Sequence, residues 1–206
     1  MPLARNALPE AASSVYQLKI TLIGSQPPIW RRVLIVGDTK LDKLHEIFQK
    51  AMGWRDCHLH MFEAGKARYA PSTPDWDDVE DESAATFQDI AAKAGISFSY
   101  VYDIGDGWRH EVEVETILPR MPDFKGLCCV AGARACPPED CGGIGGYEEL
   151  LKAIRDPGHE RHKELLDWLG GAIDPEKFDI AAVNRRMLRI SHGKTVAARP
   201  NKRWTR

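Results

Sequence analysis

ISFSYVYDIGDGWRHEVEVETIL, residues 96–118, carries the clearest structural signal in the chain. Apolar and polar residues alternate in both of its halves, and this period of two is typical of strands with one buried face. The dipeptide Asp106–Gly107 lies between the halves, and it is favoured in tight hairpin turns because both central residues need positive φ. The stretch therefore predicts two antiparallel strands joined by a short turn.

Further strands are expected nearer the N-terminus. VYQLKITLIG, residues 15–24, also alternates, and IWRRVLIV, residues 29–36, follows it after the turn SQPP. These two segments are predicted to pair as another hairpin. CHLHMFEAG, residues 57–65, predicts a short third strand, whereas the acidic, proline-containing residues 67–84 predict a surface loop.

Helical patterns lie between the strands and after them. Residues 41–52 place their apolar side chains on one stripe, with Thr39 as the cap and Gly53 as the stop. Residues 86–95 predict one or two further helical turns. Three more helices are expected over residues 147–155, 159–169 and 178–190. Helices therefore dominate the second half of the chain.

The order of these elements predicts the fold class. Strands come early, helices come late, and there is no regular alternation of strand and helix. This order favours an α+β fold, with a mainly antiparallel sheet, helices packed on it and C-terminal helical segments. We expect a flexible leader over residues 1–14, a single domain over 15–190 and a basic, disordered tail over 191–206.

Composition and charge limit the classes of function. The chain has 206 residues, of which 43% are hydrophobic and 28% charged, as in soluble globular proteins. No apolar run is long enough to span a membrane, and the start of the chain lacks the apolar core of a secretory signal, so we expect a cytoplasmic protein. The formal net charge is −2, without the basic surplus typical of nonspecific nucleic-acid binding.

The exception to this charge balance is the C-terminal stretch NRRMLRISHGKTVAARPNKRWTR, residues 184–206, which is basic and poor in acidic residues. Such a stretch is either a solvated end or a contact with nucleic acid or another protein. A DNA-binding protein acting through this tail is therefore one hypothesis. The partner is otherwise unknown, and no membrane association is expected.

The cysteine-rich stretch LCCVAGARACPPEDCGGIGGY, residues 127–147, is the first candidate site. Three of its thiols are separated by six and then four residues: Cys129, Cys136 and Cys141. Three thiolates can supply three corners of a tetrahedral zinc site, with His60 or His110 as the fourth ligand. The alternative is that these small residues pack beneath a stiff proline- and glycine-rich turn that leads into a helix.

The histidines are the second candidate. His110 shares a strand face with Val112 and Val114, so it points toward the core or a cleft wall. His58 and His60 are two residues apart and would project from one side of a strand, where two imidazoles can bind one metal. The alternative is that both histidines face solvent.

The turn YDIGDGWRH, residues 102–110, is the third candidate. Asp103 and Asp106 could act as catalytic carboxylates with His110, or they could cap backbone amides of the turn. A metal-dependent hydrolase or nuclease would use His58, His60, His110 and Asp106, which are expected on neighbouring strands. The catalytic residues stay unknown because no established catalytic or nucleotide-binding motif occurs.

Several phrases together resemble a known family. PPIWRRV, LHMF, YDIGDGWRHEVEVE, CVAGARACPPEDCGGIGGYEELL and DPEKFDIAAVNRRM match the pattern of the plasmid pRiA-type ORF-three-like family over residues 15–190. The resemblance implies an α+β domain and an association with plasmids and mobile elements. Some members are labelled transposon resolvases, but no serine-resolvase constellation occurs in this chain.

The leading hypothesis is a non-enzymatic accessory or binding protein of a mobile element, with a structural zinc. It rests on the clustered thiols and on the lack of a recognisable catalytic set. The hydrolase or nuclease and the tail-dependent DNA-binding protein are the alternatives.

Overall fold

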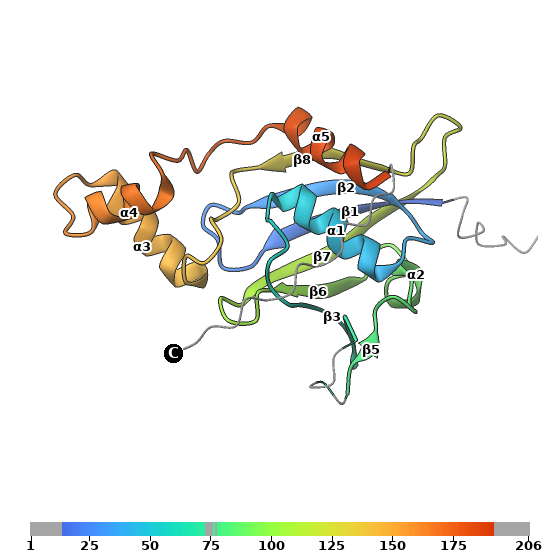
Figure 1. Cartoon of the computed structure of the whole chain (residues 1–206). Coiled ribbons are helices and arrows are strands. Elements are labelled where there is room, and N and C mark those ends of the chain that lie inside the picture. The colour runs from blue at the N-terminus through green and yellow to red at the C-terminus, as the bar shows by residue number, and fades with distance from the viewer. Residues whose placement is uncertain (1–13, 73–75, 77, 192–206) are drawn as a thin grey trace, which may run out of the picture.

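A computed structural model describes residues 14–72, 76 and 78–191, and these residues form one eight-stranded sheet (Figure 1). The strands are β1 (Ser14–Leu22), β2 (Trp30–Val36), β3 (His60–Ala64), β4 (Ala67–Ala70), β5 (Glu80–Asp81), β6 (Ser97–Tyr102), β7 (Trp108–Pro119) and β8 (Leu127–Ala133). Their order is β5-β4-β3-β6-β7-β1-β2-β8. All neighbours are antiparallel except β4 and β5.

The helices are α1 (Leu41–Met52), α2 (Phe87–Ile90), α3 (Gly143–Arg155), α4 (His162–Leu169) and α5 (Ile180–Ser191). α1 and α5 lie side by side over one face of the sheet, and α5 also packs on β8 (Figure 1). α3 and α4 form a separate helical pair beyond one end of the sheet (Figure 1). The predicted α+β class, with a mainly antiparallel sheet and C-terminal helices, is confirmed.

The predicted hairpin over residues 96–118 is confirmed as β6 and β7, in which Tyr102 pairs with Trp108. The alternation of β7 buries Trp108, His110, Val112 and Val114 on the face that α1 covers. On β2 the other face of the sheet is half-buried, and there Arg32 of β2 and Glu115 of β7 form an ion pair. One-sided burial therefore explains the period of two along these strands.

One core joins sheet and helices. Side chains from every layer belong to it, including Phe48 of α1, Tyr100 of β6, Leu150 of α3 and Met187 of α5. Each large apolar side chain buried in this way contributes about 1.5–3 kcal/mol. Within the described part of the chain, no helix is long and apolar enough to cross a membrane.

Three local predictions were wrong. Residues 67–84, predicted to be a loop, contain β4 and β5, because β4 forms a hairpin with β3 across Gly65 and Lys66. Cys128 and Cys129 lie in strand β8, not in a loop. β3 begins at His60, so the segment that carries Cys57 and His58 precedes the strand.

The helix boundaries also differ from those predicted. α3 begins at Gly143, four residues before the expected start, and α4 begins at His162. The expected leader over residues 1–14 and tail over 191–206 lie outside the described residues, apart from Ser14 and Ser191. These two residues are the first of β1 and the last of α5.

Candidate metal centre

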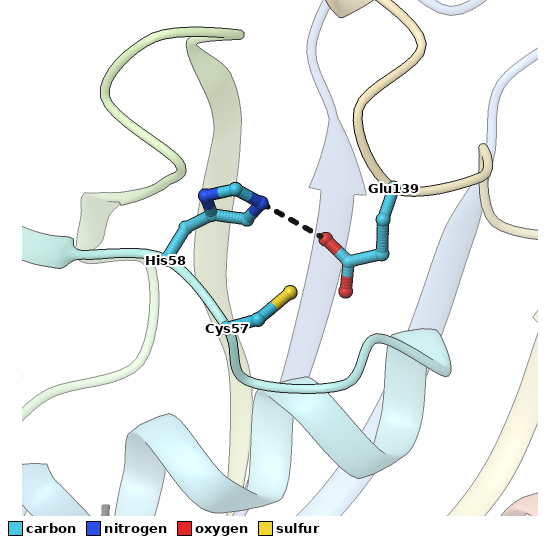
Figure 2. A group of neighbouring side chains, drawn as sticks. All are labelled: Cys57, His58 and Glu139. Atoms are coloured by element: carbon cyan, nitrogen blue, oxygen red, sulfur yellow. Dashed lines mark ion pairs between the residues drawn. The ribbon is translucent and has the colours of Figure 1, made fainter. Parts of the chain in front are cut away.

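Three connecting segments meet at the end of the sheet where β6 turns into β7. They are the segment between α1 and β3, the turn that begins at Asp103, and the loop between β8 and α3. Cys57 and His58 of the first segment point toward Glu139 of the third (Figure 2). Residues far apart in the sequence therefore share one site.

His58 lies at the centre of this site. Its Nε2 atom is 2.9 Å from Oδ1 of Asp140, 3.5 Å from Oδ2 of Asp103 and 3.9 Å from Oε2 of Glu139. The Nε2 atom is buried and within ion-pair distance of these carboxylates, yet it forms no hydrogen bond with any described residue. A nitrogen in these surroundings can be a metal ligand or, when protonated, the ion-pair partner of the carboxylates.

Two overlapping groups of side chains could hold a metal ion. The first is Cys57, His58 and Glu139, and the second is His58, Asp103 and Asp140; in each group the ligand atoms lie within 4.8 Å of one another. Burial raises the pKa of the Cys57 thiol, and the nearby Glu139 carboxylate raises it further. We favour the second group, because His58 Nε2 lies closer to Asp140 and Asp103 than to Glu139, and the Glu139 carboxylate already accepts hydrogen bonds from Arg55 and Tyr102.

The backbone around the site is unusual. Asp56, Asp103 and Asp140 have φ angles of 58°, 54° and 58°, in the left-handed region. Aspartate enters this region more readily than most residues, but the cost is still about 1 kcal/mol or more at each position. Three such residues therefore surround the site at the expense of local backbone stability.

Asp103 has a double role. Its Oδ1 atom accepts hydrogen bonds from the backbone N–H groups of Gly105 and Asp106, at 3.0 and 3.3 Å. Its Oδ2 atom faces His58. The turn-capping role considered from the sequence is thus present, and it leaves one oxygen directed into the cluster.

Asp106 joins the β6–β7 turn to the loop before α3. Its carboxylate accepts a hydrogen bond from the backbone N–H of Gly142 at 3.1 Å. The next residue, Gly143, has φ +67°, and a Cβ atom there would lie 2.4 Å from the carbonyl oxygen of Asp106. The glycines of CPPEDCGGIGGY therefore allow a close approach of two backbones, and this approach places Asp140 beside His58.

Glu139 is held firmly in the loop. It accepts a 2.7 Å hydrogen bond from the backbone N–H of Arg55 and two 3.2 Å contacts from the hydroxyl of Tyr102. The same hydroxyl accepts a bond from the N–H of Cys57, and burial raises the pKa of Tyr102. These contacts fix the loop to the segment after α1 whether or not a metal is bound.

A second histidine arrangement lies deeper in the core. The rings of His45 and His60 stack with centroids 3.4 Å apart and planes 7° from parallel. His60 Nε2 is 2.7 Å from Glu82, and His45 Nε2 is 2.8 Å from Asp56. His60 is therefore occupied by Glu82 and His45, and it belongs to neither candidate group of metal ligands.

The protonation of His45 follows from its neighbours. The hydroxyl of Tyr100 accepts a hydrogen bond from Nε2 of Gln49 and lies 2.7 Å from Nδ1 of His45. The hydroxyl is then free to donate to Nδ1, and in that arrangement His45 carries its proton on Nε2 and donates it to Asp56. Burial lowers the pKa of His45, in agreement with a neutral ring.

The five metal ligands predicted from the sequence have other surroundings. The thiol of Cys129 donates to the carbonyl of Ala131 at 3.4 Å, and burial raises the pKa of Cys136 and, to about 12, that of Cys141. His110 is fully buried, and burial lowers its pKa to about 4. Among the described residues, neither candidate group of ligands contains Cys129, Cys136, Cys141, His60 or His110.

Sequence reasoning found part of the observed cluster. His58 and Asp103 were considered as site residues, but Glu139 and Asp140 were not considered as ligands. The available signal was an acidic pair in a rigid proline- and glycine-rich turn, with no basic residue beside it in the sequence. Such a pair is costly unless its charge is balanced from elsewhere in the fold.

Comparison with known proteins agrees with the resemblance found in the sequence. The family model described as "Plasmid pRiA4b ORF-3-like protein" matches residues 14–182. This chain belongs to that family. The ORF-3-like chain is also 37% identical over 177 residues to the protein y4hQ of Sinorhizobium fredii, named as uncharacterized, covering 84% of this chain and 87% of the relative.

A solved structure shows the same fold. The crystal structure of MM3350 from Methanosarcina mazei Go1, a protein described as of unknown function, has a TM-score of 0.75 and 36% sequence identity. The match covers 82% of the ORF-3-like chain and 97% of the solved chain. The fold of most of the chain is therefore shared with this relative.

Proposed function

We propose that this ORF-3-like protein is a non-enzymatic accessory protein that binds one divalent metal ion, zinc first, through His58, Asp103 and Asp140. The observation that carries the proposal is the buried Nε2 atom of His58, which faces carboxylates without forming a hydrogen bond. Carboxylates so close to one another repel, and a metal ion bound by them and by neutral His58 would balance their charge.

The spacing of the ligand atoms fits a small divalent ion. Zinc binds histidine nitrogen and carboxylate oxygen at about 2.0–2.2 Å, so ligands at tetrahedral corners lie about 3.4 Å apart. The distances from His58 Nε2 to Asp140 and Asp103 are 2.9 and 3.5 Å. An ion would therefore need only small side-chain movements.

The role that best fits this position is structural. The ion would join the segment after α1, the β6–β7 turn and the loop before α3, which are separate in the sequence. Each of these segments also carries an aspartate in the left-handed region, and the ion would offset that cost. The association with a mobile element is supported only by the family description, which names a plasmid.

Metal binding can be tested on untagged full-length protein. We expect one equivalent of zinc by elemental analysis, and an affinity at least about tenfold lower in His58→Ala. His159→Ala is the matched control, because His159 contacts one carboxylate, Glu149, at 3.1 Å and lies outside both ligand groups. Stoichiometric zinc that survives His58→Ala but is lost in Cys136→Ser would overturn this assignment in favour of the thiolate set.

A metal-dependent hydrolase or nuclease is the second candidate. The observation in its favour is the exposure of the site, since 60% of the Asp140 side chain is accessible. Three protein ligands and an open fourth position are the usual arrangement of catalytic zinc. Of the hydrolase residues suggested by the sequence, only His58 belongs to this cluster.

The hydrolase hypothesis predicts catalytic turnover in addition to metal binding. Metal-loaded protein should hydrolyse bis(p-nitrophenyl) phosphate, and both His58→Ala and Asp103→Asn should abolish the turnover. Full zinc binding without turnover would leave the structural role as the better account.

DNA binding through the basic C-terminal tail stays a prediction, because residues 192–206 lie outside the described part of the chain. Its support is the sequence alone. We expect a DNA affinity that falls steeply with salt and disappears when residues 194–206 are deleted. Binding that persists without these residues would contradict it.

A further inference from the structure

A cleft of about 570 Å³ lies beside the metal centre, between the end of α1, residues 135–139 of the loop before α3, and α5. Sites for small organic molecules usually measure about 300–1,000 Å³. Glu139 lies on the wall between this cleft and the metal centre. The remaining lining comes from residues that the metal centre does not use.

Arg31 lies on the inner wall of the cleft and is only 2% exposed. Its guanidinium donates to the carbonyl groups of Trp30, Ala51, Ala133 and Arg134 at 2.8–3.0 Å. Among the described residues, no carboxylate lies within ion-pair distance of it. Burial lowers the pKa of Arg31, and the neighbouring Arg186 acts in the same direction. Four of its five N–H groups bond carbonyl oxygens, so Arg31 offers the cleft its positive charge and at most one free N–H.

Three more cations line the cleft: Arg55, Lys177 and Arg186. The side chains of Arg55 and Lys177 form no ion pair with the part of the chain that the structure describes, and both residues are exposed. Arg186 donates its Nε–H to the carbonyl of Lys50 at 3.0 Å and keeps its terminal amino groups near the cleft. The cleft therefore offers several cationic donors to a ligand.

The two carboxylates of the cleft are already engaged. Glu139 accepts hydrogen bonds from Arg55 N–H and the Tyr102 hydroxyl. Asp179 accepts a hydrogen bond from the backbone N–H of Ala182 at 2.9 Å, at the start of α5. The lining therefore has an excess of positive charge, because the four cations of the cleft outnumber these two carboxylates.

The walls are apolar between these charges. The indole N–H of Trp54 donates to the carbonyl of Pro137 at 3.2 Å, which fixes the ring at the mouth of the loop. Phe178 stacks against the guanidinium of Arg31, 4.8 Å from the ring centre. Ile173 and Val183 complete an apolar surface. A ligand for this cleft needs an apolar body as well as a negative charge.

We infer that the cleft binds a small organic anion, with its oxyanion head toward the exposed Arg55 and Lys177, near the buried charge of Arg31, and its apolar body against the half-buried Ile173 and Phe178. The site is distinct from the metal centre and does not depend on metal binding. Its ligand class is an aromatic or aliphatic molecule that carries a carboxylate, sulfonate or phosphate group.

The probe for this test is 8-anilinonaphthalene-1-sulfonate, an aromatic anion whose fluorescence increases on binding in an apolar site, added to the full-length protein. Arg55→Ala/Lys177→Ala should weaken its binding about tenfold, because two partly exposed cations are removed. Lys66→Ala/Arg68→Ala is the matched control, since it removes the same charge from exposed residues of the β3–β4 hairpin. It should leave the affinity within twofold of wild type.

A neutral dye distinguishes recognition of the negative charge from nonspecific binding to apolar surface. N-phenyl-1-naphthylamine lacks the sulfonate, so its weaker binding should not change between wild type and Arg55→Ala/Lys177→Ala. Three results would each overturn the inference. The first is an equal loss of affinity for both dyes, and the second is an equal loss of sulfonate affinity in the two double variants. The third is an unchanged sulfonate affinity in Arg55→Ala/Lys177→Ala. His58→Ala should retain the sulfonate affinity, which distinguishes failure of this site from failure of the metal centre.

Discussion

His58 and His60 are two residues apart, yet they lie in opposite environments. His60 is the first residue of β3, and its ring stacks on His45 and contacts Glu82 in the core. His58 precedes the strand, and its Nε2 atom faces three carboxylates without a hydrogen bond. The difference shows that a closed set of partners makes a structural histidine, whereas an excess of negative charge around one nitrogen makes a candidate ligand.

The largest effect on stability is expected at His60, the histidine with a closed set of partners. His60→Leu leaves the Glu82 carboxylate, whose side chain is 7% exposed, without its partner. We expect a loss of about 3–5 kcal/mol in the free energy of unfolding, measured with urea. Adding Glu82→Leu should recover part of this loss, because the unpaired charge is then removed.

His58→Ala is the companion variant for this prediction. In metal-free protein it should change the free energy of unfolding by less than about 1 kcal/mol. The variant loses the contacts of His58 with the carboxylates, but it also removes a buried nitrogen that has no hydrogen bond. A loss in His58→Ala as large as that in His60→Leu would contradict the division into closed and open histidines.

A buried histidine outside both arrangements gives a pH-dependent effect. Burial lowers the pKa of His110 to about 4, below the ordinary value of about 6.5. The unfolded chain therefore binds this proton at a higher pH than the folded chain, and the stability that depends on neutral His110 is lost as pH falls from about 7 to about 4. We expect its share of that loss to be about 3 kcal/mol.

His110→Phe isolates this contribution. The variant keeps an aromatic ring in the core and has no proton to bind, so its stability should fall less steeply with acid than that of wild type. Urea unfolding at several pH values measures both slopes. Equal slopes would show that the acid sensitivity arises at other groups, such as the His45–Asp56 pair.

The sequence predicts the sheet better than the site, and particular residues show why. Alternation is a local signal, so it was sufficient for β6 and β7. The predicted two-residue turn at Asp106–Gly107 was wrong, because residues 103–107 connect the strands and the positive φ angles are at Asp103 and Gly107. β4 was missed because it has only four residues and owes its pairing to β3. Tertiary pairing, not local pattern, makes that strand.

The metal centre depends on contacts that no local pattern contains. His58 meets Asp140 only because the β6–β7 turn docks on the glycines before α3. The cysteines drew attention because they are close in sequence, yet Cys129 lies in β8 and Cys141 lies in the loop before α3. Both candidate groups of ligands instead combine residues from separate segments, which spacing along the chain does not indicate.

Zinc should stabilise the metal centre around His58 and leave the contact between His60 and Glu82 unchanged. With zinc at about 100 times its dissociation constant, the free energy of unfolding should rise by about 2.7 kcal/mol. Asp103→Asn should remove most of this increment, because the variant loses a charged ligand but keeps an oxygen to cap the turn. An equal increment in wild type and Asp103→Asn would place the zinc elsewhere.

Two glycines two residues apart test whether the backbone approach itself builds the open site. Gly143→Ala would place a Cβ atom 2.4 Å from the carbonyl oxygen of Asp106, at a position with φ +67°. The turn and the loop must then separate, so we expect a loss of about 1–2 kcal/mol in stability and weaker zinc binding. Gly145→Ala is the control, because it has nothing within 4 Å and lies in α3.

Gly145→Ala should leave zinc affinity unchanged and raise stability by up to about 1 kcal/mol, since alanine favours a helix. The pair separates two explanations of the site. If Gly143→Ala lost stability but kept full zinc affinity, the position of Asp140 would not depend on the contact between Asp106 and the loop. Gly143→Ala could instead bind zinc weakly and regain its lost stability when it is saturated with zinc. That result would show that the ion can restore the contact between the turn and the loop, as expected of a structural metal.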